Sequence, residues 1–378
     1  MKVYLDNAAT TPVHPLVVEA MLPVLSNQFG NPSSIHSFGR EVRTVIEGAR
    51  KKVAQLLNTS PSEIFFTSGG TEADNMAIRC CVHDLGVTHI ITSAIEHHAV
   101  LHTAEDLEAR GLVKLSLVNV DKFGQVDLNH LESLLKEEGK TLVSLMHANN
   151  EIGTMISIEQ VGTLCRKYNA LFHSDTVQTL GHFVHDLSVL PVDFITGAAH
   201  KFHGPKGVGF LYINNRVKIK PYITGGAQER NMRGGTENVY GIVGLAKALE
   251  IAYEHIESDI KEISALKKYM MDELKASIPG VEFHGDQRPE HSLYTVLNVC
   301  FPPCENAEML LFSLDIAGIA CSAGSACSSG SNVGSHVLKG IGADPNRPTI
   351  RFSFSRFNTK EEIDYCVEKV RELFLVKA

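Results

Sequence analysis

Short β-rich segments alternate with helical stretches between about residues 50 and 215. The β-rich segments cover residues 64–67, 89–92, 142–146, 171–174, 193–196 and 208–213. Amphipathic patterns over residues 39–57 and 158–168 predict helices around them. Such alternation is typical of parallel strands with helices on both faces of the sheet. The sequence therefore predicts an α/β fold with a large, doubly wound, mainly parallel sheet.

The pattern changes in the last third of the chain. A long helical pattern over residues 243–274, which we expect to form two helices, leads to Pro279 and Gly280. Beyond them, strand-like runs at 295–299 and 349–354 mix with helical patterns at 305–314 and 360–373. We expect a large domain over residues 14–257 and a smaller α+β domain formed by residues 1–13 and 258–378.

Composition and charge exclude several classes of function. The chain has 378 residues, of which 44% are hydrophobic and 21% charged, so it can bury a large core and is not a disordered or small disulfide-stabilised protein. The net charge of −8 and the lack of a basic cluster argue against a nucleic-acid partner. No apolar run reaches the ~18 residues of a membrane span, and no secretion signal is evident. We expect a cytoplasmic protein whose eight cysteines are thiols.

The segment after the first β-rich run is suited to bind a phosphate. Residues 64–67 lead directly into Ser68, Gly69, Gly70 and Thr71, where a helical pattern begins. The unpaired N–H groups and the dipole of a helix N-terminus attract an anion. An ordinary strand-to-helix turn has the same composition and is the more common case, so this segment alone decides nothing.

Two further strand ends carry reactive side chains. Asp175 ends the run at 171–174, and Lys201 follows the run at 193–196 within a glycine-rich segment. Ligands of open α/β sheets bind at the carboxyl ends of the strands. A phosphate-binding turn, a buried carboxylate and a lysine that can form a Schiff base are the three contacts that pyridoxal phosphate requires. A solvated loop is the alternative for Lys201, and the combination argues against it.

Motifs along nearly the whole chain resemble the group I cysteine desulfurases, the iron-sulfur cluster-assembly and nitrogen-fixation type, within the class V aminotransferase superfamily. The motifs are Tyr4 to Pro12, Gly30 to His36, Thr67 to Asn75, Glu96 to Val100, Asn149 to Gly153, the segment around Lys201, Arg233 to Asn238, Gly324 to Cys327 and Arg351 to Ser353. The resemblance implies the fold type I of pyridoxal-phosphate-dependent transferases. It also implies pyridoxal 5'-phosphate as the cofactor.

The resemblance assigns a role to each candidate residue around the cofactor. Lys201 would hold the cofactor covalently and later act as the base at the substrate Cα, and Asp175 would keep the ring nitrogen protonated. His97 would stack on the ring and move protons. The other implied contacts are Asn150 and Gln178 to the phenolic oxygen, and Gly70, Thr71 and His200 to the phosphate.

Substrate binding and assembly are implied in the same way. Arg351 would bind the substrate carboxylate as a bidentate pair, assisted by Asn31. Thr236 would reach the phosphate of a neighbouring subunit, which implies a homodimer with shared sites.

Cys327 is the predicted sulfur acceptor. A thiolate can take sulfur from L-cysteine as a persulfide, leaving L-alanine. Its surroundings, residues 321–335, are rich in Ser, Gly and Ala, which predicts a mobile arm. We expect Cys80, Cys81, Cys165 and Cys366 to be buried and inert, whereas Cys321 is ambiguous. No complete metal site is predicted, since Cys300 and Cys304 lack further ligands; Cys327 remains a candidate transient iron-sulfur ligand with a scaffold partner.

One position departs from the family pattern. The family usually has a serine, a phosphate ligand, three residues before the Schiff-base lysine, whereas this chain has Ala198. A hydrogen bond to a charged group contributes ~1.5–3 kcal/mol, so the loss would weaken cofactor binding without abolishing it. Thr196 and Ser68 are the two candidates for compensation, and the sequence does not choose between them.

The sequence therefore predicts a cysteine desulfurase, a sulfurtransferase whose sulfur supplies iron-sulfur cluster assembly or tRNA thiolation through an acceptor protein. A selenocysteine lyase and a non-catalytic assembly scaffold are the alternatives. Turnover on cysteine and on selenocysteine separates the two enzymes. A scaffold has no physical need to keep Lys201, Asp175, His97 and Cys327 together.

Overall fold

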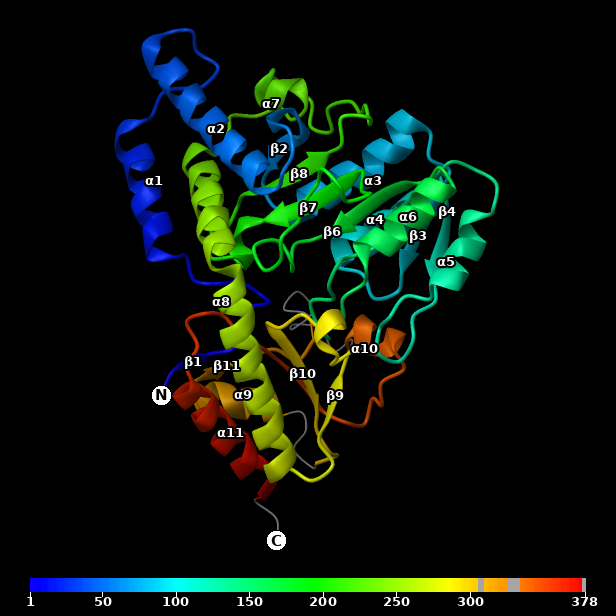
Figure 1. The fold of residues 1–378 in the computed structure, drawn as a ribbon, viewed down its shortest axis with the longest axis vertical. Coiled ribbons are helices and arrows are strands. Elements are labelled where there is room, and N and C mark those ends of the chain that lie inside the picture. The colour runs from blue at the N-terminus through cyan, green and yellow to red at the C-terminus, as the bar shows by residue number, and fades with distance from the viewer. Residues whose placement is uncertain (305–308, 325–333, 376–378) are drawn as a thin grey trace.

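A computed structural model describes residues 1–304, 309–324 and 334–375. Its centre is a seven-stranded sheet in the order β2-β8-β7-β6-β5-β3-β4 (Figure 1). The strands are β2 (Ile64–Thr67), β3 (His89–Ser93), β4 (Lys114–Val118), β5 (Thr141–Ser144), β6 (Leu171–Asp175), β7 (Phe194–Ala198) and β8 (Gly209–Ile213). The pairs from β7 to β4 are parallel, and β8 runs antiparallel to both of its neighbours. The predicted α/β fold with a mainly parallel sheet is confirmed.

Helices cover both faces of this sheet. Successive strand residues point to opposite faces, so Ile90 packs in one hydrophobic core while Ile91 packs in the other. The first face carries α3 (Gly70–Leu85) and α4 (His98–Ala109). The second face carries α1 (Pro15–Asn27), α2 (Ser37–Leu56), α5 (Leu128–Leu135), α6 (Ile158–Lys167) and the first half of α8 (Val239–Ser277). Because both faces are covered, the strands read as continuous apolar runs.

A second, smaller core lies at the other end of α8. It contains a three-stranded antiparallel sheet in the order β12-β10-β9 and a parallel pair of β1 with β11. These strands are β1 (Val3–Tyr4), β9 (Glu282–His284), β10 (Val296–Cys300), β11 (Ile319–Ala320) and β12 (Thr349–Ser353). The helices of this part are α9 (Leu310–Ile316), α10 (His336–Gly340) and α11 (Lys360–Leu375). The N-terminal residues Val3 and Leu5 pack in this core, although they are distant in sequence from its other members.

Helix α8 joins the two cores as one continuous helix. Leu249 packs in the core of the large sheet, and Ile263 packs in the smaller core. The expectation of two helices over residues 243–274 is wrong. The stretch between the cores contains no glycine or proline, and its residues favour a helix, so nothing interrupts the backbone hydrogen bonds. At 1.5 Å per residue, 39 helical residues span about 58 Å, enough to reach both cores (Figure 1). The predicted domain boundary at residues 257 and 258 stays a prediction.

Two further differences from the predicted elements concern β4, at an edge of the sheet, and β8, which lies between β2 and β7. Strand β4 was absent from the predicted strands because its residues are partly exposed and include the polar Lys114 and Ser116. The antiparallel direction of β8 follows from its short connection to β7 and could not be read from hydrophobicity. Four short elements complete the described chain: η1 (Pro61–Glu63), η2 (Ala199–Lys201), α7 (Gln228–Asn231) and η3 (Pro289–His291).

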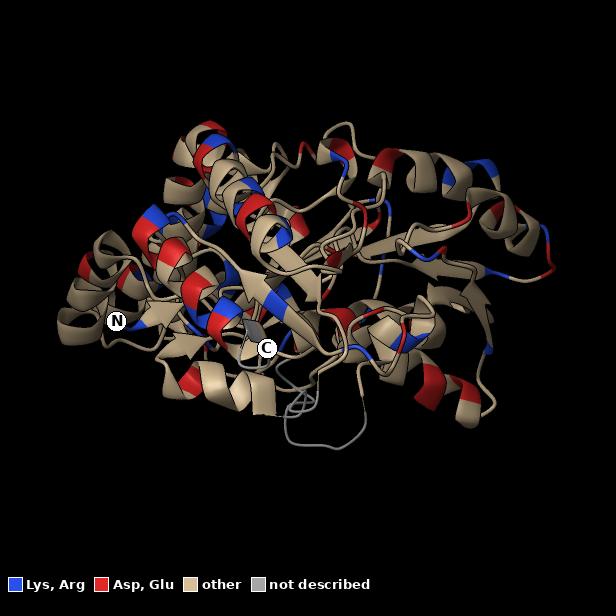
Figure 2. Cartoon of the chain, turned by 90° about the horizontal axis from the view of Figure 1, so that it is seen from below, with Lys and Arg blue, Asp and Glu red and all other residues tan. Residues whose placement is uncertain are grey.

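Charge is distributed without a dominant sign on the face seen from below. Figure 2 shows acidic and basic residues interspersed along the helices of that face. In the described residues, no helix is both long and apolar enough to cross a bilayer.

Candidate active site

A cavity of about 220 Å³ opens at the carboxyl edge of the large sheet. It is lined by Ala8, Ala9, Gly70, Thr71, Asp74, His97, Met146, Ala148, Asn150, Asp175, Val177, Gln178, Ala198, His200, Lys201 and Arg351. Most of these residues end or directly follow β2, β3, β5, β6 and β7, whose carboxyl ends share one edge of the sheet. The cavity therefore brings together segments from residue 8 to residue 351.

One end of the cavity is the N-terminus of α3. Its N-cap, Gly69, has no side chain to accept a hydrogen bond from the first turn, so N–H groups of that turn remain available to an anion. Gly70 and Thr71 line the cavity there, together with His200 from η2 (Ala199–Lys201). A Cβ atom at Gly70 would lie 2.9 Å from a methyl group of Val177, so only glycine fits without a shift. Burial, then Lys201 and Lys206, lowers the pKa of His200 to about 4.

Lys201 reaches into the cavity from η2. Its Nζ donates hydrogen bonds to the carbonyl oxygens of Ala8, at 2.6 Å, and Ala9, at 2.9 Å. Both alanines belong to the N-terminal segment, which also packs on the smaller core. The amine is thus held at the cavity wall by two backbone oxygens.

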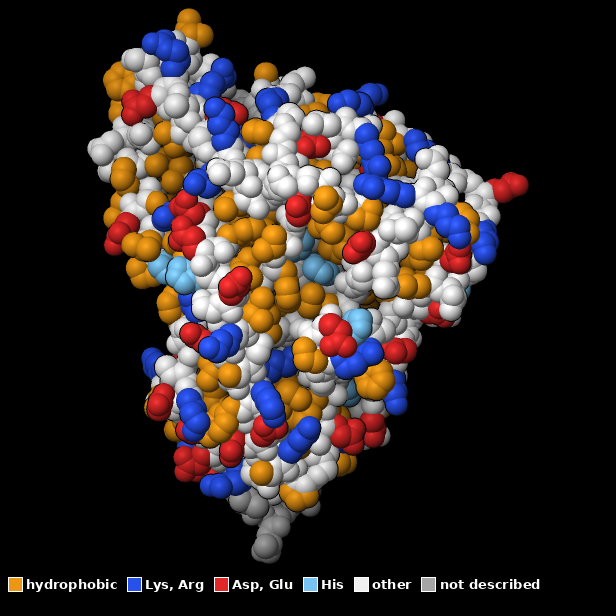
Figure 3. Space-filling view, viewed as in Figure 1, with side chains coloured by type: hydrophobic (Ala, Val, Ile, Leu, Met, Phe, Trp, Pro, Cys, Tyr) orange, Lys and Arg blue, Asp and Glu red, His pale blue; other side chains and the backbone are white. Residues whose placement is uncertain are grey.

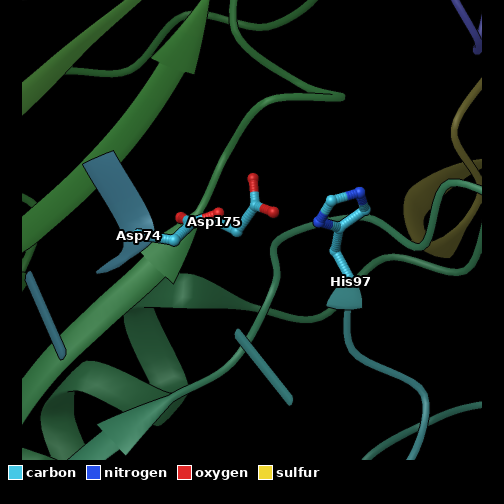
Figure 4. Close-up of side chains that lie close together, drawn as sticks. All are labelled: Asp74, His97 and Asp175. Atoms are coloured by element: carbon cyan, nitrogen blue, oxygen red, sulfur yellow. The ribbon is translucent and has the colours of Figure 1, made fainter. Parts of the chain in front are cut away.

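Asp175 lies at the floor of the cavity, at the end of β6. Its Oδ1 accepts a hydrogen bond from the backbone N–H of Val177 at 2.9 Å. Burial, and then the nearby Asp74, raises the pKa of Asp175 to about 6. Figure 4 shows Asp175 between Asp74 and His97, and one polar atom of each lies within 4.8 Å of the others. The carboxyl group therefore faces the cavity with one oxygen fixed.

His97 is the N-cap of α4, and this role sets its tautomer. Its Nδ1 accepts a hydrogen bond from the backbone N–H of Ala99 at 3.1 Å, which leaves the proton of the neutral ring on Nε2. Burial lowers the pKa of His97, with Lys201 also lowering it and Asp175 opposing the change. At neutral pH the ring is uncharged and its Nε2–H is available at the cavity.

Arg351 closes the cavity from β12. Its guanidinium donates to Oδ1 of Asp6 at 2.8 Å and to the carbonyl oxygen of Asn150 at 2.8 Å. The Arg351 side chain is almost fully buried, and its Nε has no hydrogen-bond partner among the described residues. Gln178 donates to the carbonyl of Ala8 at 3.0 Å. Arg351 lines the cavity, and a guanidinium group in that position can bind a carboxylate.

Glu151 lies beside Asn150 and contacts both described ends of the segment that contains Cys327. Its Oε2 accepts a hydrogen bond from Oγ of Ser335 at 2.5 Å. A Cβ atom built on Gly324 would lie 3.3 Å from that same Oε2 and 3.3 Å from Cβ of Ser335. Gly324 and Ser335, which precede and follow Cys327 in the sequence, therefore lie together at Glu151, next to the cavity wall.

Two predicted site residues, Thr236 and Asn31, do not line this cavity, and a third, Cys327, is not described. Thr236 lines a second cavity of about 160 Å³, which also contains Ser68 and Arg233. Asn31 is exposed, and its Oδ1 accepts a hydrogen bond from the backbone N–H of Ser33 in a local turn. Cys327 lies outside the described residues, as do residues 325–333 of the predicted mobile arm.

The structure adds residues that the sequence reasoning did not assign. Asp74 follows Gly70 by one helical turn on α3, so helical spacing alone could have placed it on the cavity side. Asp6, the partner of Arg351, and the carbonyls of Ala8 and Ala9 had no such signal. Their contacts depend on how the N-terminal segment crosses between the two cores.

Neither candidate for replacing the missing serine hydroxyl lines the cavity. Ala198 itself is a lining residue. Ser68 lies in the second cavity, and Oγ1 of Thr196 is buried beneath the floor, 3.1 Å from Nε2 of His173. Of the hydroxyl residues in the described chain, Thr71 is the one that reaches the cavity.

The described cysteines do not enter the cavity. Cys80, Cys81, Cys165 and Cys366 are buried, as expected, and burial raises the pKa of each thiol. Cys321, which the sequence left ambiguous, is half-buried, and burial raises its pKa to about 12. These thiols stay protonated at neutral pH and are poor nucleophiles.

Comparison with known proteins agrees with this geometry. The aminotransferase class-V family model matches residues 3–366. The chain belongs to this family. The cysteine desulfurase IscS of Dictyoglomus turgidum is 44% identical over 376 residues, which cover 98% of this chain and 94% of that protein. A solved NifS-like protein superposes with a TM-score of 0.91 at 41% identity and covers 99% of both chains. A NifS-like protein from Rickettsia africae has a TM-score of 0.89 at 32% identity, with 99% of both chains covered.

Within the class-V aminotransferases, this chain is therefore a member of the cysteine desulfurase family, with fold type I architecture and pyridoxal phosphate as its cofactor. The cavity fits that group. The uncapped α3 N-terminus suits a phosphate, the amine of Lys201 an aldehyde, and the carboxyl of Asp175 a protonated ring nitrogen. When bound, the cofactor supplies an electron sink for the bonds at the substrate Cα.

Proposed function

We propose that this protein is a cysteine desulfurase that converts L-cysteine to L-alanine and transfers the sulfur to Cys327. In the balanced reaction, the Cβ–S bond of the substrate breaks and an S–S bond forms on the Cys327 sulfur. The substrate carbon skeleton gains a hydrogen at Cβ, and Cys327 becomes a persulfide. No external oxidant or reductant is consumed, because the sulfur carries its oxidation equivalent with it.

The observation that carries this proposal is the position of Gly324 beside the cavity wall. Glu151, which contacts Gly324 and Ser335, is the neighbour of Asn150, and Asn150 lines the cavity and accepts a hydrogen bond from Arg351. Cys327 is three residues beyond Gly324. Three residues of extended chain span at most about 10 Å, so Gly324 lies close enough to the cavity for an acceptor three residues farther along the sequence to serve this site.

Each side chain of the cavity has a separate role in the proposed reaction. Lys201, bound to the carbonyls of Ala8 and Ala9, is placed to remove and return a proton at the substrate Cα. The neutral His97 is placed to exchange protons through Nε2, and Arg351 binds the substrate carboxylate. Asp175 presents a carboxyl oxygen to the ring nitrogen of the cofactor. Asn150, Gln178, Gly70, Thr71 and His200 are proposed to fix the cofactor's other polar groups.

The activity is tested by incubating the holoenzyme with L-cysteine and a reducing thiol. We expect alanine and sulfide in equal amounts, because each turnover releases one carbon skeleton and one sulfur. Selenocysteine is the comparison substrate, and faster turnover on it would favour the lyase alternative. No alanine from either substrate would leave only the scaffold function and would refute the proposal.

Arg351 should control substrate affinity more than cofactor binding. A lysine in its place presents a single ammonium group instead of a fork, and the loss of one charge-assisted hydrogen bond of ~1.5–3 kcal/mol implies a loss of roughly 10- to 100-fold in kcat/KM, mainly through KM. Arg351→Lys is measured by steady-state kinetics alongside the absorption spectrum of the bound cofactor. The matched control is Arg347→Lys, which changes an arginine bound to Glu282 and the Gly280 carbonyl outside the cavity. An unchanged KM in Arg351→Lys would argue against the carboxylate role.

The predicted homodimer also belongs to this proposal. Apolar side chains are exposed on α1 and the segment after it, with Phe29 78% and Ile35 91% accessible. Figure 3 shows hydrophobic side chains gathered along the left edge, over α1. Through Ser33 and Gln228, this segment is linked to Gly235, which precedes Thr236. A second subunit that covered this surface would lie next to Thr236, as a site shared between subunits requires.

Charges in this apolar surface should prevent dimer formation. We expect the double variant Phe29→Asp and Ile35→Asp to sediment as a monomer at concentrations where the wild type is a dimer, because an interface does not bury unpaired carboxylates. The variant should also bind pyridoxal phosphate more weakly if Thr236 contributes across the interface. Val189→Asp, at a surface site that is 69% exposed, is the matched control and should remain dimeric. A monomeric wild type would contradict the proposal.

We further propose an acceptor protein for the persulfide, either an iron-sulfur scaffold on which Cys327 serves as a transient ligand or a sulfur relay for tRNA thiolation. The support is the resemblance of the chain and the IscS name of its relatives. The cytoplasmic location stays a prediction.

A further inference from the structure

Asp74 is a second carboxyl group at the floor of the cavity, for which the proposed reaction has no use. It lies on α3 and is 1% exposed. Its Oδ1 is buried without a hydrogen-bond partner among the described residues. Figure 4 shows its carboxyl group beside that of Asp175. A buried carboxyl oxygen without a donor is costly when it carries a charge.

The neighbours of Asp74 supply an acceptor for a proton rather than a counter-charge. Oδ1 lies 3.4 Å from Nε2 of His173. Nδ1 of His173 lies 2.8 Å from Oγ of Ser144, and Nε2 lies 3.1 Å from Oγ1 of Thr196. Burial lowers the pKa of His173 to about 4, so the ring is neutral. A neutral ring with its proton on Nδ1 donates to Ser144 and can accept from a protonated Asp74.

The charges that face the two carboxyls come from several elements. They are Glu96 and His97 before α4, His173 on β6, and Lys201 on η2. Burial lowers the pKa values of His97 and His173, so neither ring carries a positive charge at neutral pH, and Glu96, whose pKa burial raises, is itself an acid. Lys201 carries a single positive charge and is bound to the carbonyls of Ala8 and Ala9, so it balances at most one of the two carboxylates. Two carboxyls so close together in a buried site do not ionise at the same pH, and the second keeps its proton to a higher pH than the first.

The hydrogen bonds decide which of the two carboxyls keeps the proton. Asp175 receives the backbone N–H of Val177 on Oδ1, which stabilises its anion. Asp74 has a hydrogen bond with the side chain of Thr196, but its Oδ1 receives no donor among the described residues. We propose that Asp74 is held as the neutral carboxylic acid, hydrogen-bonded toward His173, and is a positioning residue that confines the negative charge of the cavity floor to Asp175.

This assignment gives the cofactor's ring nitrogen one anionic partner in a fixed place. Only this consequence rests on the proposed function, because the protonation state of Asp74 does not depend on a bound cofactor or substrate. The pKa values agree in order, because burial raises that of Asp74 to about 7 and that of Asp175 to about 6.

The test is infrared spectroscopy of the cofactor-free chain from pH 5 to 9. We expect a buried carboxylic-acid carbonyl band that disappears with a midpoint near pH 7, about three units above the ordinary value for aspartic acid. The band should be missing in Asp74→Asn. It should remain in Asp175→Asn but titrate at lower pH, because the neighbouring negative charge is gone. Asp272→Asn, which changes an exposed aspartate on α8, is the matched control and should leave the band unchanged.

A second measurement uses the wild-type protein alone, so it remains valid if the Asp74→Asn variant does not fold. In wild-type protein labelled with ¹³C at the aspartate carboxyl carbons, one carboxyl resonance in the nuclear magnetic resonance spectrum should titrate near pH 7. If every aspartate titrates below pH 5, or if the infrared band survives in folded Asp74→Asn, the proposal is wrong. Neither measurement uses cofactor or substrate. A failure of the Asp74 proposal is therefore distinguishable from a failure of the proposed desulfurase activity.

Discussion

Replacing Lys201 by alanine is expected to lower kcat at least about 10⁴-fold, because the variant loses both the covalent attachment of the cofactor and the base at the substrate Cα. The cavity offers no substitute at that position, since the carbonyls of Ala8 and Ala9 that hold the amine are acceptors only. Alanine formation from L-cysteine measures the loss of kcat. Borohydride reduction followed by peptide mass analysis measures the covalent attachment of the cofactor, and the wild type alone should carry the cofactor on residue 201.

The matched control for this variant is Lys206→Ala. Lys206 is an exposed lysine in the same glycine-rich segment, so it tests the effect of removing a positive charge nearby. It should retain most of the activity and the reducible cofactor on Lys201. Activity within tenfold of wild type in Lys201→Ala would show that another group performs the chemistry.

Replacing Cys327 by serine should lower desulfurase turnover by about 10³-fold or more, as expected when a catalytic nucleophile is removed. A hydroxyl does not accept sulfur as a thiolate does. Cofactor binding should be unaffected, because no predicted cofactor contact involves this residue, and the absorption spectrum checks this. The measurement is single-turnover alanine formation in the presence and absence of a reducing thiol.

Cys304→Ser is the control for Cys327→Ser. Cys304 is a half-buried thiol of the smaller core region and is absent from the cavity lining. It should leave turnover unchanged. Full turnover in Cys327→Ser would mean that sulfur leaves the cavity without this cysteine, and the sulfur-transfer part of the proposal would fail.

The architecture could be predicted from sequence where local pattern and packing agree. The apolar runs that became β2, β3, β6 and β7 are buried on both faces, so each stands out from its polar flanks. The edge strand β4 was missed because its residues are partly exposed and include polar side chains, so they do not form a continuous apolar run. The continuity of α8 was missed because hydrophobic spacing reports which face is buried but not whether one helix serves two cores.

The site could be predicted where chemistry is attached to a strand end. Asp175 and Lys201 follow buried strands, and the common edge of a parallel sheet brings them together. Helical spacing from Gly70 places Asp74 on the cavity side of α3, but its closeness to Asp175 depends on how α3 packs against β6, a tertiary contact. Asp6 reaches Arg351 across 345 residues of sequence, and no local signal indicates such a pair.

The most direct test is mass spectrometry of the holoenzyme after brief exposure to L-cysteine without a reducing thiol. The central claim predicts one added sulfur on the peptide that contains Cys327 and none on the peptides that contain the buried cysteines. It also predicts that a reducing thiol removes this mass and releases one sulfide per subunit. Stoichiometric alanine with an unmodified Cys327 peptide, or sulfur carried on another cysteine, would contradict the account.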